Sequence, residues 1–559
     1  MLFRSCLHAL VAAAPYSHNL FVTRPASLSR GRGLSYTRHY PYASDYALAL
    51  DDVLSNELAL RLARRLFAAI SARHRFQELE RLNNWESAGL AQSPDILDDV
   101  LESLESFDIE RSPPSPNTQR LPDETRSATI LIDWARTVIL QDWKATAIVP
   151  ADGAFGGALT LIKAIYDRRK PLLLTEQNFR AEFFADRLDS AEMPIEWLTF
   201  APNRKSVHLL DYPFLFSKAS LVTYFRAINF SRMSGAFDAS TTMNIRVTTV
   251  AYSAPLSLVT DPTRRDHLNE KLRVATSKFL VLQIRRTHVL TDAFDKLWRR
   301  EERELLRPLK IKLGEEGGEE GSDSGGVQQE FFRLAIAEAL NPDYGAFTID
   351  ERTKMIWFQA SSPEPLWKFE LIGLLVGLAI YNGLTLPVTF PKVLYRKLLG
   401  QPITELHHIE DGWPELAAGL TALLEWDEKD GLVSDIFCRT YEFSADVFGA
   451  PVSIDMSAPN PSPWPQFASL AHTKISSELA SEAPEAPMVD ASNRNDYVSD
   501  YISHLTTISI APQFAAFQRG FLTCLEPRSL ALFTPSLLQS TVEGRSEEHT
   551  SELQSPRLS

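Results

Sequence analysis

The sequence predicts a mostly α-helical protein with small β elements, an α+β fold. Apolar residues recur at helical spacing from Asp45 to about Leu82, from Ala128 to Leu174 and from Ser217 to Met233. Phe279–Leu313 begins as an apolar strand-like run and continues as an amphipathic helix that ends at Pro308. The chain has 559 residues, of which 44% are apolar, and this length allows about three or four domains with real cores.

The first 44 residues contain five arginines, many serines and no acidic residue before Asp45. This composition is typical of a mitochondrial transit peptide, and the apolar run Leu7–Ala14 behind Arg4 also fits a weak signal peptide. Both interpretations depend on Met1 being a true start. We expect residues 1–44 to be a disordered and unreliable N-terminal end, followed by a helical upstream region of unknown function over residues 45–250.

Two segments of the upstream region break its helical pattern. Glu102–Arg126 is polar and contains four prolines, which favours a linker or a surface excursion. Ala151–Ala158 (ADGAFGGA) places glycines ahead of an apparent helix. It matches neither GxxxxGK[ST] nor GxGxxG, so we predict no nucleotide site there.

In the second half, glycine and proline mark the ends of several predicted helices. Asp323–Gly326 (DSGG) precedes a helix that ends at Asn341-Pro342, and we interpret the glycine pair as a tight turn. Phe390-Pro391 opens another helix, which Gly400 closes. The longest apolar stretch, Leu371–Leu386, contains glycines and polar residues, whereas a membrane span needs about 20 predominantly apolar residues. We therefore predict a buried core helix and no membrane partner.

Charge and residue usage exclude several function classes. Lysine and arginine total 57 against 71 aspartates and glutamates, a formal net charge of −14 at pH 7, so we predict no nucleic-acid partner. Three scattered cysteines exclude a disulfide framework and favour a reducing compartment, the cytoplasm, the nucleus or both. Without a carboxylate or cysteine companion at metal-ligand spacing, the pair His407-His408 is interpreted as surface loop, and we predict no metal site.

Several motifs in the second half resemble one family in order and spacing. They are RRTHVLTDA (285–293), DSGGVQQEFF (323–332), NPDYGAF (341–347), LIGLLVGLAIYNG (371–383), FPKVLYRKLLG (390–400), VFG (447–449) and QFAAFQRGF (513–521). Residues 279–544 therefore resemble the N-lobe of a HECT-type ubiquitin-protein ligase, closest to the group of the papillomavirus E6-associated protein and its fungal relatives. Asp211–Phe230 also resembles the segment that precedes this domain in those relatives.

The resemblance implies a large helical subdomain, a smaller subdomain that binds a ubiquitin-conjugating enzyme, and transfer chemistry without a cofactor. In the family, a ligase cysteine takes ubiquitin from the thioester on the conjugating enzyme, and a substrate lysine then attacks the new thioester. The implied partners are a ubiquitin-conjugating enzyme, ubiquitin and unknown protein substrates. The resemblance also implies that the catalytic cysteine lies in a separate C-terminal lobe.

None of the three cysteines lies in a sequence context that matches the family's catalytic cysteine. Thr523-Cys524 superficially resembles the family's catalytic dipeptide, but Cys524 directly follows an N-lobe motif and shares helical spacing with Phe517 and Phe521. We therefore interpret Cys524 as a buried structural thiol. Cys438, in the apparent strand IFCRTYEF, is likewise interpreted as a packing residue, and Cys6 carries no information.

The resemblance places the docking groove for the conjugating enzyme in Leu420–Ser444 and the helix that follows. Leu420 and Leu424 share one helix face at i and i+4, and alternate residues of a strand share a side. The positions that match the family's groove are Leu420, Leu424, Trp426, Tyr441, Phe443, Tyr497 and Tyr501. For each residue, groove lining and subdomain core both remain open. Pro451–Ser492, which is rich in proline, serine and alanine, is expected to be a disordered insertion.

The two ends of the chain resemble nucleotide sequence of another origin. Arg545–Ser555 (RSEEHTSELQS) is the translation of a string resembling a short-read sequencing adapter, and Leu2–Ser5 (LFRS) translates the reverse complement of an adapter end. We expect residues 545–559 to be an artefactual tail and the natural transcript to diverge near Gly544 into the catalytic lobe. A ligase fragment that is inactive alone is then expected. The alternative is a naturally truncated, non-catalytic module that binds conjugating enzymes.

Overall fold

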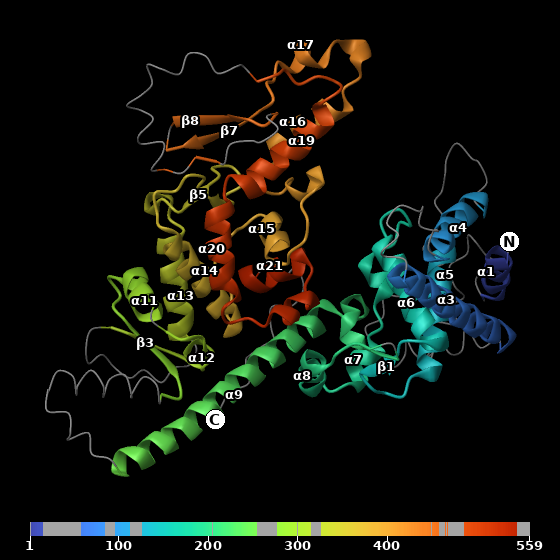
Figure 1. The fold of residues 1–559 in the computed structure, drawn as a ribbon, viewed down its shortest axis with the longest axis horizontal. Coiled ribbons are helices and arrows are strands. Elements are labelled where there is room, and N and C mark those ends of the chain that lie inside the picture. The colour runs from blue at the N-terminus through green and yellow to red at the C-terminus, as the bar shows by residue number, and fades with distance from the viewer. Residues whose placement is uncertain are drawn as a thin grey trace, which may run out of the picture. The chain divides into compact units, whose positions relative to one another are not determined.

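A computed structural model of the chain is shown in Figure 1. It describes residues 2–14, 57–83, 96–111, 126–253, 277–314, 326–457, 464–467 and 486–544, except the single positions 204, 299, 449 and 466. The chain divides into two compact units, residues 1–227 and 228–559. Each unit is described separately.

The first unit is a helical assembly with one short strand pair. Its elements are α1 (Leu2–Ala13), α3 (Glu57–Asn83), α4 (Ile96–Arg111), α5 (Ser127–Asp142), β1 (Ile148–Pro150), α6 (Gly153–Asp167), η3 (Glu176–Phe179), α7 (Phe183–Arg187), α8 (Glu192–Thr199), β2 (Ser206–His208), η4 (Leu209–Asp211), η5 (Pro213–Leu215) and the start of α9 (Lys218–Ser253). Strands β1 and β2 pair antiparallel. Helix α5 is buried along most of its length, so it forms the centre of this core.

Glycines in α6 permit its close packing against α3. A Cβ atom on Gly157 would lie 1.9 Å from the backbone oxygen of Phe67, a separation that real Cβ atoms do not show. The helix begins at Gly153, so the glycines that we predicted ahead of a helix lie inside it. Their role is close helix contact, and this accounts for them without a phosphate ligand.

The larger part of the second unit surrounds helix α14, the predicted core helix. Its elements are β3 (Leu280–Ile284), α11 (Val289–Leu297), α12 (Glu302–Leu305), β4 (Leu309–Leu313), α13 (Gly326–Ala339), η7 (Pro342–Tyr344), β5 (Phe347–Ile349), β6 (Ile356–Phe358), α14 (Leu366–Tyr381), α15 (Lys392–Leu398), α20 (Ala511–Leu522), η11 (Pro527–Leu532) and α21 (Pro535–Glu543). Strands β3 and β4 pair parallel, and β5 and β6 pair antiparallel. From Phe369 to Tyr381 only Glu370 is not fully buried, so the prediction of a core helix is confirmed.

A smaller group of elements builds a separate core, which we call the small subdomain (Figure 1, top). It contains η8 (Leu406–His408), α16 (Pro414–Glu425), η9 (Glu428–Asp430), α17 (Val433–Phe437), β7 (Glu442–Val447), β8 (Ala450–Asp455), α19 (Arg494–Ser503) and the π-helix η10 (His504–Ile508). Strands β7 and β8 form an antiparallel hairpin in which Phe443 pairs with Ile454. Helices α16 and α19 pack with this hairpin around the core.

Several predictions of irregular structure were wrong. Residues Leu2–Ala13 form α1, where Leu7 and Leu10 are buried, although we expected disorder over 1–44. Helix α4 continues to Arg111, inside the predicted linker. Polarity and proline content misled the linker prediction, because a helix with one apolar side can be mainly polar. Helix α1 was missed because its burial depends on packing against α5. Residues 15–44 and the linker prolines lie outside the described residues.

Two further corrections concern the second unit. All but the first residue of β8, and the buried residues Met456, Trp464 and Val489, lie within the predicted disordered insertion 451–492. Backbone pairing with β7 and aromatic packing stabilise them, and neither is visible in local composition. The helix predicted before Pro308 is two short helices, and the residues after the proline form β4. The predicted tail, 545–559, lies outside the described residues. Within the described residues, no helix is both long and apolar enough to cross a membrane.

Candidate functional site

The predicted docking residues all lie in the small subdomain, but the structure divides them into two groups. Four belong to its buried core: Leu420, Tyr441, Phe443 and Tyr497, each at most 5% exposed. Three are partly buried and pack against the core: Leu424, Trp426 and Tyr501. Only the second group has side-chain surface that a partner could contact directly.

Rings from β7 and α19 form the base of the site. The ring of Phe443 lies 5.1 Å from that of Tyr501 and 5.4 Å from that of Trp464, between ring centroids. Tyr441, directly before β7, contacts Tyr497 at 5.4 Å. The Tyr441 hydroxyl donates to Asp500 Oδ2 at 2.8 Å. Burial, and then this hydrogen bond to Asp500, raise the pKa of the Tyr441 hydroxyl, so it stays a neutral donor at physiological pH.

Helix α16 ends beneath the guanidinium group of Arg494, at the start of α19. One nitrogen of Arg494 donates to the backbone oxygens of Leu423 at 3.2 Å and Trp426 at 2.8 Å. These bonds satisfy carbonyl groups that a helix end leaves without an intrahelical partner. The indole nitrogen of Trp426 in turn donates to the Gly431 oxygen at 3.0 Å. The partly buried residues of the site are thus held in a defined place.

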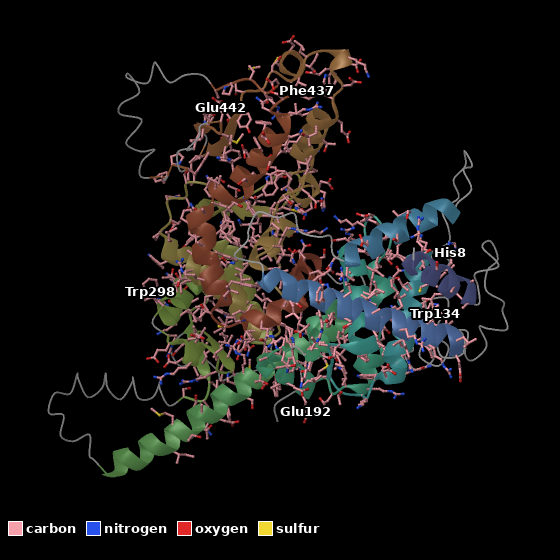
Figure 2. All side chains as sticks on the ribbon, turned by 45° about the vertical axis from the view of Figure 1, so that its right-hand side comes forward. His8, Trp134, Glu192, Trp298, Phe437 and Glu442 are labelled. Atoms are coloured by element: carbon pink, nitrogen blue, oxygen red, sulfur yellow. The ribbon has the colours of Figure 1, made fainter. Side chains whose placement is uncertain are left out.

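Sequence reasoning missed two strongly exposed apolar residues of this region, Leu432 and Ile436. They are 57% and 51% exposed; Leu432 directly precedes the short helix α17, and Ile436 lies in it. Phe437, labelled at the top of Figure 2, packs edge-on against the Trp426 ring at 5.5 Å between centroids. The spacing of Leu432 and Ile436, four residues apart, was the available signal, because such residues share one side of a helical turn.

The two described cysteines of the second unit differ in exposure. Cys524 is fully buried, and burial raises the pKa of its thiol to about 12. Its placement as a buried thiol is therefore confirmed, and little thiolate exists near neutral pH. Cys438 was predicted to be a packing residue in a strand, which is wrong. It is exposed, follows α17, and has a left-handed backbone with φ of 47°.

This difference predicts selective alkylation. In the native protein, iodoacetamide is expected to modify Cys438 and to leave Cys524 unmodified until the protein is unfolded, because the thiolate is the reactive form and must be accessible. Peptide mass spectrometry before and after denaturation measures both sites. Modification of Cys524 at the rate of Cys438 under native conditions would contradict its burial.

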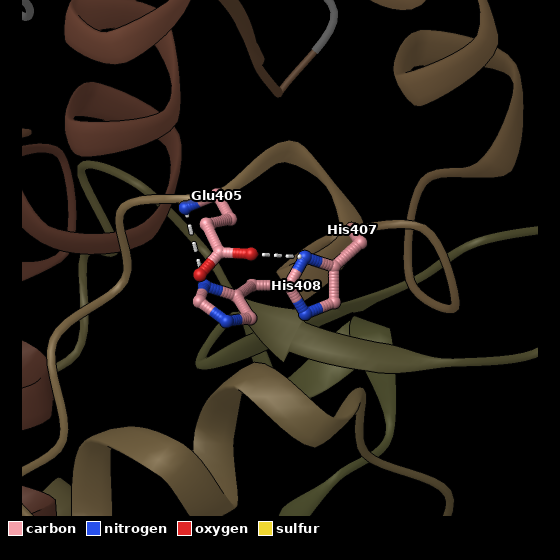
Figure 3. Close-up of side chains that lie close together, drawn as sticks. All are labelled: Glu405, His407 and His408. Atoms are coloured by element: carbon pink, nitrogen blue, oxygen red, sulfur yellow. Dashed lines mark hydrogen bonds and ion pairs between the residues drawn. The ribbon is translucent and has the colours of Figure 1, made fainter. Parts of the chain in front are cut away.

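Glu405, His407 and His408 form the single group of three possible metal ligands found in the described part of the chain (Figure 3). Their candidate ligand atoms lie within 4.8 Å of one another. Glu405 is the carboxylate companion that we missed, and His408 is buried, which corrects the surface-loop interpretation. The Glu405 backbone N–H donates to His408 Nδ1, and Glu405 Oε2 lies 2.9 Å from His407 Nδ1. Glu405 and His408 form a capping box at η8, and His407 pairs with Glu405, so each of the three side chains has a role in the local fold.

The sequence of this part of the chain also matches a known family. Residues 333–556 match the family model described as HECT-domain (ubiquitin-transferase). The matched range contains the small subdomain and all seven predicted docking residues.

Curated proteins of several organisms are similar to about half of the chain or somewhat more. The chain is 30% identical over 275 residues to the human probable E3 ubiquitin-protein ligase HERC4, which covers 49% of the chain and 23% of that protein. It is 33% identical over 279 residues to the human probable ligase HECTD2, covering 48% of the chain and 32% of that protein. With the Schizosaccharomyces pombe probable ligase mug30 it shares 25% identity over 341 residues, 60% of the chain and 35% of that protein. The matched part is thus about a third or less of each relative.

Proposed function

We propose that the chain is part of an E3 ubiquitin-protein ligase and that its small subdomain docks a ubiquitin-conjugating enzyme, because residues 333–556 match the HECT-domain family model. The observation that carries the docking proposal is that Leu424, Trp426 and Tyr501 pack against the aromatic core of the small subdomain and are only partly buried. Large apolar and aromatic side chains with accessible surface are what a binding hot spot needs.

The core residues support the docking site indirectly. Phe443 and Tyr441 hold Tyr501 and Tyr497 in place through ring contacts, and Arg494 holds the end of α16. A surface that is already ordered loses little conformational entropy when a partner binds. A modest apolar contact can therefore give a specific, transient complex, which suits an enzyme that must leave once it has delivered ubiquitin.

Ubiquitin transfer itself requires an accessible thiolate that accepts the acyl group from the conjugating enzyme. Cys524 has neither accessibility nor a low pKa. In this proposal the described part of the chain therefore contributes docking, and the acyl acceptor is not Cys524. The free cysteines agree with a reducing compartment, the cytoplasm or the nucleus.

The proposal predicts that Leu424→Asp weakens binding of a conjugating enzyme more than tenfold. A tenfold change corresponds to about 1.4 kcal/mol, and burying one large apolar side chain contributes about 1.5 to 3 kcal/mol. Biolayer interferometry against a panel of conjugating enzymes measures the dissociation constant, and circular dichroism checks the fold.

The matched control is Leu366→Asp, because Leu366 also has accessible surface, being 44% exposed, but begins α14 outside the small subdomain. It is expected to bind like the unchanged protein. Failure of every conjugating enzyme to bind the unchanged protein would reject the proposed function. Equal loss in both variants would remove Leu424 from the docking surface.

A further inference from the structure

A projecting segment of the small subdomain combines exposed apolar residues with unpaired acidic ones. We call residues 424–437 the α16–α17 tip. Leu432 and Ile436 are its exposed apolar residues, and Trp426 and Phe437 pack together beneath them. Exposed apolar residues of this size, grouped on one segment, indicate a contact surface for another protein.

The charge of this segment is strongly one-sided. Its one basic residue is Lys429. Its five acidic residues are all exposed: Glu425, Asp427, Glu428, Asp430 and Asp435. Lys429 Nζ pairs with Asp427 Oδ2 at 2.9 Å, and this hydrogen bond lowers the pKa of the Asp427 carboxyl. Within the described residues, no ion pair joins the other four carboxylates to a basic side chain. Exposed carboxylates are ionised at neutral pH, so the tip is negative.

We propose that the α16–α17 tip selects a conjugating enzyme whose docking face is basic, and that it accelerates their association. This inference rests on the proposed docking function and names the chemistry of the partner. Like charges on one short segment repel one another, so a partner that brings lysine or arginine beside them relieves repulsion and gains attraction. The apolar residues then supply the short-range contact once the partner has arrived.

The consequence of this arrangement is a salt-dependent association rate. Complementary charge steers diffusing proteins toward each other, and the effect falls steeply as ionic strength rises, because charges beyond about 8 Å are screened at physiological salt. The apolar contact affects mainly dissociation, because mutations within one interface change the dissociation rate most. The two roles of the segment can therefore be separated by kinetics.

The test is stopped-flow association between the full chain and a conjugating enzyme with a basic docking face, at low and high ionic strength. The double variant Glu428→Lys/Asp430→Lys is expected to associate about tenfold more slowly at low ionic strength, with the difference nearly lost at high ionic strength. The control, Asp343→Lys/Glu351→Lys, changes the same net charge at exposed positions outside the small subdomain and is expected to have little effect. Replacing basic residues of the conjugating enzyme by glutamate is expected to restore fast association with the tip variant.

Each other outcome contradicts the inference. Binding of the unchanged protein without salt dependence, or equal slowing in the control, would reject electrostatic selection and leave the docking function standing. Absence of binding by the unchanged protein to any conjugating enzyme would reject both.

Discussion

Replacing Gly520 by alanine is expected to lower the free energy of unfolding of the second unit by roughly 3 kcal/mol or more, the upper range for overpacking a core. Gly520 lies in α20 where that helix meets α14. A Cβ atom there would lie 1.8 Å from the backbone oxygen of Glu370, and one on Gly373 would lie 2.0 Å from that of Phe517. Because the obstructing atoms are backbone, the two helices must move apart.

Chemical denaturation followed by circular dichroism measures this loss. The matched control is Gly419→Ala in the exposed side of α16, where nothing lies within 4 Å of the new methyl group. Alanine favours helix over glycine by about 1 kcal/mol, so the control is expected to be neutral or stabilising. Equal stability of the Gly520 and Gly419 variants would show that α14 and α20 do not approach as closely as described.

Replacing Phe443 by alanine is expected to cost about 3 to 5 kcal/mol in the small subdomain, the usual range for a buried phenylalanine. Phe443 is 2% exposed and contacts the rings of Trp464 and Tyr501. Losing it leaves a cavity at the centre of the small core. Amide hydrogen exchange is expected to accelerate in β7, β8 and α19, while α14 keeps its protection, because small cores can open locally.

This change also tests how the core supports binding. Docking of a conjugating enzyme is expected to fail in the Phe443 variant because the residues above the core lose their support. Phe448→Ala is the control, because Phe448 follows the same strand but is 53% exposed. Surface changes usually shift stability by less than about 0.5 kcal/mol. Undiminished protection of β7 and α19 in the Phe443 variant would place Phe443 outside the core.

Long periodic segments could be predicted from the sequence, and short or paired ones could not. The apolar run around Leu371–Tyr381 predicted α14 because every side of that helix is buried. The strands β4 and β8 were missed, since a strand of five or six residues depends on the partner it pairs with. Helix α1 was missed because its burial depends on packing against α5, far away in sequence: the Trp134 indole donates to the Leu10 oxygen at 3.1 Å.

By itself the sequence determined the family resemblance, the helical spacing of Leu420 and Leu424, and the run of acidic residues that follows them. Those properties are local, so they can be read from residue types and their separation. Only the tertiary structure decided that Leu420 is core while Leu424 retains accessible surface, and that Leu432 and Ile436 are exposed. The apolar side of a helix has two edges. The elements that pack against the helix, here β7 and α19, decide which edge is covered. Exposure is thus a property of the packed chain, and local sequence does not determine it.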